Sequence, residues 1–180
     1  MTTQIARDPK TDHLLTPENS ALILIDFQPG LIDGTRSVSR EILVNNVLAL
    51  AKTGSLFKLP IVLTTVAVSA GYQEDTIAEL KSALPGVSTV DRSRVNAWEE
   101  PAFREAVIAT GRRKLIMAGL WTEVCLVFPP WTCSTKRIIQ AGAIPVTWEA
   151  VMAELARLNM ADYDMSGFME LMNVHLPRSV

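Results

Sequence analysis

The chain alternates between short apolar runs and longer amphipathic segments. Four runs rich in branched apolar side chains lie at residues 21–26, 61–66, 115–119 and 143–147. Continuous apolar runs of this length, without alternation of polar and apolar positions, are typical of strands that are covered on both faces. The pattern therefore predicts four strands of a mostly parallel sheet.

Apolar positions recur at helical spacing between these runs. The spacing predicts helices over residues 41–57, 75–84, 101–110 and 149–158. Pro101 and Gly111 stand where Pro and Gly are preferred, at the first helical position and just beyond the last. Strands that alternate with helices indicate an α/β fold, with helices on both faces of the sheet. Pro145 has no N–H to donate, so we expect the last strand at an edge.

Composition and charge narrow the class of protein. With 180 residues, 48% of them hydrophobic, the chain can bury the core of a single domain over residues 1–180. A net charge of −2 predicts no contact with nucleic acid, and the apolar runs are too short to span a membrane. The N-terminus lacks the apolar core of a signal peptide, and Cys125 and Cys133 are the two cysteines. We therefore expect a cytoplasmic protein.

Two reactive side chains follow predicted strands. Asp26 closes the first apolar run, and Cys125 lies six residues after Gly119, which closes the third. Ligands bind beyond the carboxyl ends of strands in open α/β sheets, so the two side chains share one crevice if their strands are neighbours. A carboxylate can accept the proton of a thiol and so activate it. Arg92 and Arg94 are candidates for a cation that holds this pair charged.

Each of these residues also has a purely structural interpretation. Cys125 lies in the apolar segment VCLVF, where a cysteine is commonly a small buried side chain. Asp26 can cap a turn, and the arginines can form surface pairs. His13 and His175 lie near opposite ends of the chain, and neither metal-ligand spacing nor a phosphate-binding loop occurs. The sequence therefore predicts no metal and no cofactor.

Several segments resemble the isochorismatase-like hydrolases, in particular the YcaC-type cysteine hydrolases. They are ALILIDFQPG, NNVLALAKTGSLFKLPIVLTT, RSRVNAW and IMAGLWTEVCLVFP, and the resemblance resumes over IIQAGAIPVTWEAVMAEL. It implies a three-layer, doubly wound parallel sheet of strand order 3-2-1-4-5-6. It also implies a catalytic triad of Asp26, a basic residue and Cys125, in which Arg92 is the preferred match and Arg94 the alternative.

The same resemblance implies the reaction and the partners. A small amide or other C–N bond would be hydrolysed through a thioester, without a cofactor, by a homo-oligomer for which an octamer is one candidate. Gln28, Trp121, Thr122 and Glu123 would contact the substrate. A cis peptide near residues 120–122 would aim backbone N–H groups at the oxyanion. The stretch TTVAVSAGYQED lacks the histidine that metal-binding nicotinamidases carry after the second strand.

The resemblance is interrupted after Pro129. The chain then reads PWTCSTKR and goes directly to IIQAGAIPVTW, which leaves it short of the family pattern by roughly two dozen residues, enough for a whole strand–helix unit. A natural deletion, a damaged sequence over residues 130–137 and residues missing from a longer chain are the three explanations. A true deletion predicts lower stability. The alternative functions are a non-catalytic oligomeric scaffold and, third, a flavodoxin-like nucleotide binder, which the absence of a phosphate-binding loop opposes.

Overall fold

Four parallel strands form the centre of the structure, a computed structural model that describes residues 8, 10, 12–120, 143–156 and 164–176. They pair in the order β3-β2-β1-β4. This order confirms the predicted α/β class and the first four positions of the implied sheet order. The strand bounds are Ser20–Ile25 for β1, Ile61–Val66 for β2, Thr89–Arg92 for β3 and Lys114–Gly119 for β4.

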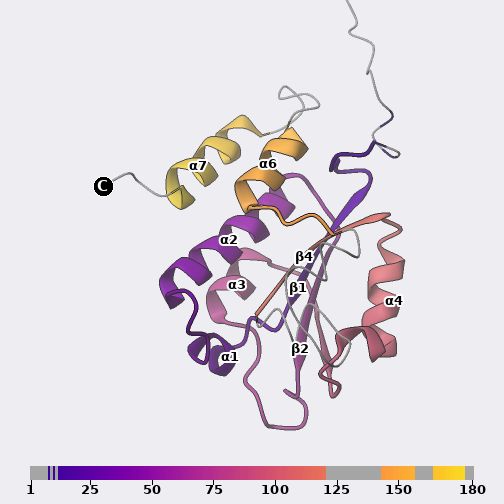
Figure 1. Cartoon of the computed structure of the whole chain (residues 1–180), viewed down its shortest axis with the longest axis vertical. Helices are drawn as coiled ribbons and strands as arrows, with labels where there is room; N and C mark the ends of the chain where they lie inside the picture. Colours follow the sequence, from indigo (N-terminus) through magenta and orange to yellow (C-terminus); the bar gives the residue numbers. More distant parts are fainter. Residues whose placement is uncertain (1–7, 9, 11, 121–142, 157–163, 177–180) are drawn as a thin grey trace, which may run out of the picture.

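Helices cover both faces of this sheet. In Figure 1, α2, α3, α6 and α7 lie on one side of the strands and α4 lies on the other, so that three layers form. α2 contacts α3, α6 and α7, whereas α4 contacts β2 and β3. The helix bounds are Pro29–Asp33 for α1, Arg40–Leu56 for α2, Ala78–Ala83 for α3, Pro101–Ala109 for α4, Trp148–Ala156 for α6 and Met165–His175 for α7, with a 3-10 turn, η1, at Ala97–Glu99.

The core divides into two apolar clusters, and β1 contributes to both. Leu22 and Leu24 belong to the cluster beneath α2, α3, α6 and α7, whereas Ile23 and Ile25 belong to the cluster that holds Phe103 of α4. Successive side chains of a strand point to opposite faces, so a strand between two helical layers must be apolar throughout. Every residue of β1 is buried for this reason.

Packing is close where α2 crosses β1. A Cβ atom added at Gly54 would lie 2.8 Å from Cδ2 of the buried Leu22 side chain, so any larger residue would require Leu22 or the helix to shift. Ser39 caps the start of α2, because its hydroxyl accepts a hydrogen bond from the backbone N–H of Ile42 at 3.3 Å. This helix forms one wall of the cavity described below.

Residues 143–147 are a correction to the predicted secondary structure. The segment is exposed and irregular, and leads into α6. Ile144 is 80% exposed, and Pro145 has no N–H with which to join a strand ladder. The prediction of a strand here is wrong. The four predicted helices are present as α2, α3, α4 and α6, whereas α1, β3 and α7 were not predicted. In the described ranges, no helix has both the length and the apolar character to cross a membrane.

Candidate active site

Asp26 follows the last residue of β1 in a left-handed backbone conformation. Its φ is 64°, and its backbone N–H donates to the carbonyl oxygen of Thr64 at 3.0 Å. Left-handed backbone is unfavourable for most residues, and Asp is one of the few side chains enriched there. The turn carries the chain out of the sheet and leaves the Asp26 carboxylate buried at the carboxyl end of β1.

Arg92, the last residue of β3, forms a bidentate ion pair with Asp26. Its Nη1 and Nη2 atoms each lie 2.6 Å from a different carboxylate oxygen. The side chains of Arg92 and Asp26 are 0% and 2% exposed, so water screens this pair very little. Arg94, the alternative basic residue, instead donates from its exposed side chain to the backbone oxygen of Glu99 at 2.8 Å. The geometry therefore brings Arg92, and not Arg94, to Asp26.

Further contacts fix the guanidinium of Arg92. Nη1 donates to the backbone oxygen of Thr65 at 3.0 Å and to the Thr64 hydroxyl at 3.3 Å, and Nη2 donates to the backbone oxygen of Val95 at 3.1 Å. Within the described residues, Nε of Arg92 is buried and has no hydrogen-bond partner. A buried donor without a partner costs about 1–3 kcal/mol. An acceptor that reached this N–H would remove that cost.

Gln28 lies two residues beyond Asp26 and is fully buried. Its Nε2 donates to the backbone oxygens of Val66 at 3.1 Å and Glu74 at 2.7 Å, and its Oε1 accepts from the backbone N–H of Val66 at 3.0 Å. Both amide hydrogens are therefore bound to protein backbone. These contacts hold the chain around Asp26, and the direct substrate contact expected from the resemblance stays a prediction.

Asp91 stands beside Arg92 on β3 and binds the loop that follows β2. Its Oδ1 accepts from the Thr65 hydroxyl at 3.0 Å and from the backbone N–H of Val68 at 3.2 Å, and its Oδ2 accepts from the backbone N–H of Ser69 at 2.8 Å. Burial alone would raise the pKa of Asp91. The hydrogen bonds from Ser69, Val68 and Thr65 outweigh burial and lower this pKa to about 2. Asp91 was not predicted from the sequence, because its contacts arise from the register between β2 and β3.

Cys125 lies outside the described residues, as do Trp121, Thr122 and Glu123, the expected cis peptide, and residues 130–137. The two strands that precede Asp26 and Cys125 both lie in the described part of the chain. β1 and β4 are neighbours, and Ile25 pairs with Gly119 in their register. The chain therefore leaves β4 next to the point at which β1 leads into Asp26, six residues before Cys125.

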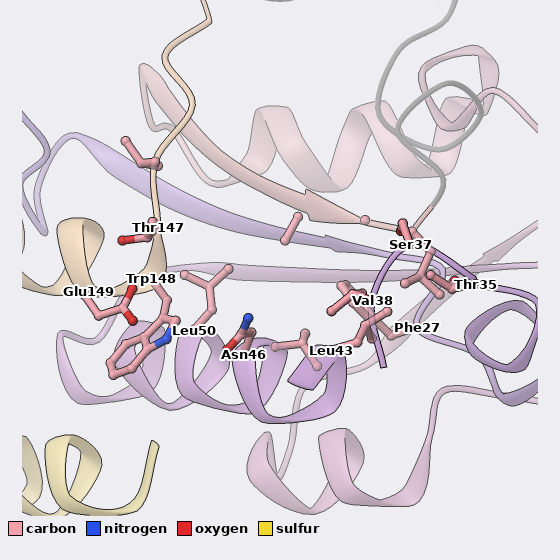
Figure 2. A pocket seen from close by; sticks show the side chains of 15 residues that line it. Phe27, Thr35, Ser37, Val38, Leu43, Asn46, Leu50, Thr147, Trp148 and Glu149 are labelled. Atoms are coloured by element: carbon pink, nitrogen blue, oxygen red, sulfur yellow. The ribbon is translucent and has the colours of Figure 1, made fainter. Parts of the chain in front are cut away.

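A separate cavity of about 530 Å³ lies between α2, the end of β4 and the start of α6. In Figure 2, Leu43, Asn46 and Leu50 extend from α2 into this space, and Trp148 and Glu149 border it from α6. Neither Asp26 nor Arg92 lines it. Across the part of the chain that the structure describes, no three His, Cys, Asp or Glu side chains gather as a group able to hold a metal ion.

Comparisons with known proteins agree with this architecture. The profile of the Isochorismatase domain matches residues 20–128. The probable hydrolase YcaC of Escherichia coli (strain K12) is 33% identical, in an alignment that covers 91% of this chain and 89% of that protein. A structure of YcaC from Pseudomonas aeruginosa, with hexane-2,5-diol and covalent acrylamide, has a TM-score of 0.81 at 32% identity and covers 93% of this chain and 94% of its own.

A second solved structure is equally similar. The E. coli YcaC gene product, described as an octameric hydrolase of unknown specificity, has a TM-score of 0.81 at 33% identity, with 93% of each chain covered. The sequence alignment with E. coli YcaC is 190 positions long but contains only 91% of the 180 residues of this chain. About 26 positions of the alignment are therefore gaps in this chain. This agrees with the shortfall predicted from the sequence. The matched profile, the identity over nine-tenths of the chain and the shared sheet together establish that the chain belongs to the isochorismatase family and is similar to its YcaC hydrolases.

Proposed function

We propose that this protein is a cysteine-dependent hydrolase of a small amide or related C–N bond, with Asp26, Arg92 and Cys125 as its catalytic residues. The observation that carries the proposal is the buried, bidentate Asp26–Arg92 pair at the carboxyl end of the sheet. Removing two charges from water is costly, and a buried ion pair is seldom an efficient way to stabilise a fold. A buried ion pair at the carboxyl end of an open α/β sheet, where ligands bind, supports a catalytic role.

In the proposed reaction, the Asp26 carboxylate accepts the proton of the Cys125 thiol. The thiolate sulfur attacks the carbonyl carbon, and a new S–C bond forms as the carbonyl oxygen becomes an oxyanion. Asp26 returns the proton to the amine nitrogen when the C–N bond breaks, which leaves a thioester on Cys125. Water then attacks the thioester with Asp26 as base, and the acid and the free thiol are released.

Arg92 has a different task in this scheme. A guanidinium does not give up its proton in proteins, so Arg92 orients and neutralises Asp26. Its buried Nε–H, which has no partner among the described residues, would donate to an oxygen of the substrate. We also propose that backbone N–H groups near Cys125 stabilise the oxyanion, where loss of one donor costs about 3 kcal/mol, and that Trp121, Thr122 and Glu123 contact the substrate. Gln28 holds the chain next to Asp26 through its hydrogen bonds to Val66 and Glu74.

The relatives support the class of reaction and an assembly. The E. coli relative is described as an octameric hydrolase of unknown specificity, which supports a homo-oligomer, with an octamer as the first form to test. The P. aeruginosa relative is described with covalent acrylamide. Acrylamide is a small amide that adds to thiolates, so it is a suitable probe for Cys125. The two cysteines of the chain suit a reducing compartment. We therefore retain the cytoplasm and a single domain over residues 1–180 as predictions.

The test is the rate of acrylamide addition to Cys125 against pH, in a Cys133→Ser background so that one thiol reports. An ordinary thiol titrates near pH 8.5, and activated thiols titrate well below it. We expect fast labelling that persists below pH 7, and a loss on the order of tenfold at pH 6 in Asp26→Asn. A companion variant, Asp26→Asn with Arg92→Met, avoids an unpaired buried charge and should lose labelling in the same way.

A second function, the non-catalytic oligomeric scaffold, is favoured by the aligned positions that this chain lacks. It predicts an ordinary thiol profile for Cys125 that neither Asp26 variant changes. That result would remove the hydrolase proposal.

A further inference from the structure

The loop that leaves β2 begins beside the Asp26–Arg92 pair. Val66, the last residue of β2, is the register partner of Arg92 on β3. Towards β1, the backbone oxygen of Thr64 accepts a hydrogen bond from the backbone N–H of Asp26. Residues 67–76 then run from this point to α3. The loop therefore leaves the carboxyl end of β2, the strand that lies between the two strands whose ends carry the ion pair.

Two side chains restrain this loop. Gln28 binds both of its ends, since its amide contacts Val66 and the backbone oxygen of Glu74. Inside the loop, the backbone N–H groups of Tyr72 and Gln73 donate to the carbonyl oxygen of Ala67 at 3.1 and 3.2 Å. A loop of this length is ordinarily mobile, so these contacts show that its conformation is specified.

The Asp91 carboxylate restrains the first turn of the loop. Ala67 has a φ of 60°, a left-handed conformation that alanine seldom adopts, and its backbone N–H donates to the carbonyl oxygen of Arg92 at 2.7 Å. The next two backbone N–H groups, of Val68 and Ser69, both donate to Asp91. Consecutive N–H groups in such a turn form a small anion-binding nest. Here the anion is a side chain, which compensates for the strained backbone.

Asp91 also reaches the ion pair through a single residue. Its carboxylate accepts a hydrogen bond from the Thr65 hydroxyl, and the backbone oxygen of Thr65 accepts a hydrogen bond from Nη1 of Arg92. The same carboxylate thus holds the loop and one support of the guanidinium. Asp91 makes no direct hydrogen bond to Asp26 or Arg92 among the contacts of the described residues, so any effect on the site is indirect.

We propose that Asp91 is a positioning residue for the Asp26–Arg92 site, which fixes the backbone of residues 67–69 as a rigid wall against which the amide group of the substrate is oriented. The inference rests on the proposed function. A rigid wall orders an amide-bearing molecule before reaction, and ordering of reactants contributes to rate independently of how nucleophilic the thiol is. Loss of Asp91 should therefore separate two quantities: the orientation of an amide and the reactivity of Cys125.

The test uses two thiol reagents on the full chain in the Cys133→Ser background. Acrylamide carries an amide, and methyl methanethiosulfonate does not. In Asp91→Asn the side-chain NH2 group replaces one of the two carboxylate oxygens, so a donor would face the backbone N–H groups of the loop. We therefore expect faster hydrogen exchange at the amides of Val68 and Ser69. We expect the acrylamide rate to fall fivefold or more, while the methanethiosulfonate rate changes less than twofold and the pH midpoint of labelling stays unchanged.

Asp75→Asn is the matched control. Asp75 lies near the other end of the same loop, where it accepts from Lys81 Nζ at 2.6 Å and from the Thr76 backbone at 2.6 Å, so the variant removes one charge without touching residues 67–69. Thr65→Val is a second variant, which removes one contact of Asp91 and keeps its charge, and it should give a smaller loss of the same kind.

Three outcomes would overturn the inference. Equal losses with both reagents would make Asp91 a purely structural residue, and unchanged rates despite faster exchange would show that the wall orients nothing. An ordinary thiol profile in the parent protein would remove the proposed function and this inference together, and that result is visible before any Asp91 variant is made.

Discussion

Asp26 and Arg92 compensate each other's charge inside the protein. Each is buried, and each satisfies the charge of the other through two hydrogen bonds. Asp26 is predicted from its position at the end of an apolar run, whereas Arg92 and Arg94 are two candidate cations in the segment VDRSRVNAW. The sequence alone does not separate the two arginines, because no apolar run marks where β3 ends. β3 ends at Arg92, so Arg94 lies in the exposed turn beyond it.

A double-mutant cycle would measure the dependence between these two residues. Removal of one partner leaves a buried charge alone, so Arg92→Met should lower the free energy of unfolding by about 3–5 kcal/mol. Asp26→Asn with Arg92→Met should recover a large part of this loss. Urea unfolding checks both values. Arg94→Met is the matched control and should change the free energy by less than about 0.5 kcal/mol, as exposed substitutions usually do. Equal effects at Arg92 and Arg94 would contradict the assignment.

The individual elements differ in how well the sequence predicts them. β1, β2, β4 and four helices follow from continuous apolar runs and helical spacing, because these elements bury apolar side chains. β3 is a four-residue strand, TVDR, that carries the charged residues of the site and so has no apolar run. Its register with β2 brings Asp91 to the loop. No pattern in the sequence contains that information.

α7 was not predicted because its sequence, MSGFMELMNVH, has Gly in the first turn and Asn, Val and His at the end, residues of lower helix propensity that weaken the signal of Met, Glu and Leu between them. Its position depends on His175, which is 5% exposed and lies against α2. Lys52 Nζ lies 3.1 Å from Nε2 of His175, and Asn45 Oδ1 lies 2.8 Å from Nδ1. An ammonium can only donate, so Nε2 accepts and the neutral ring donates from Nδ1. From α6, Trp148 faces the same ring edge to face, with centroids 6.4 Å apart.

This arrangement predicts a loss of stability in acid. Burial, and then the charge of Lys52, lower the pKa of His175 below its ordinary value of 6.5. Above pH 6.5 the ring is neutral in folded and unfolded chains alike. Below pH 6.5 the unfolded chain binds a proton that the folded chain resists, so the free energy of unfolding falls with pH until the lowered pKa is reached.

Urea unfolding at pH 7.5 and 5.5 measures the effect. We expect His175→Gln to reduce the difference between the two pH values, and Lys52→Met to reduce it in part. A wild-type difference that persists in His175→Gln would contradict the prediction.

For the whole molecule, the feature that bears most on stability is the gap of about 26 positions in this chain when it is aligned with E. coli YcaC. A strand–helix unit lost from the interior of a parallel sheet would expose backbone groups and apolar side chains. We therefore expect this chain to melt at a lower temperature than E. coli YcaC. A chimera that carries the additional residues of that relative should melt at a higher temperature than this chain, and its assembly can be compared with the octamer described for that relative. Calorimetry and light scattering check the two quantities. Cooperative melting at an equal temperature, in an equal assembly, would contradict the expectation.

The pairing of β1 with β4 also determines when this protein can fold. Ser20 must wait for Lys114 before the central ladder can close, so a nascent chain leaves the ribosome with its most apolar segment, ALILI, lacking half of its native neighbours. Such non-local closure slows folding, and an uncharged apolar stretch of this kind is prone to intermolecular β-pairing while it waits. The central position that makes β1 the most completely buried of the four described strands also leaves one of its edges unpaired until β4 has been synthesised.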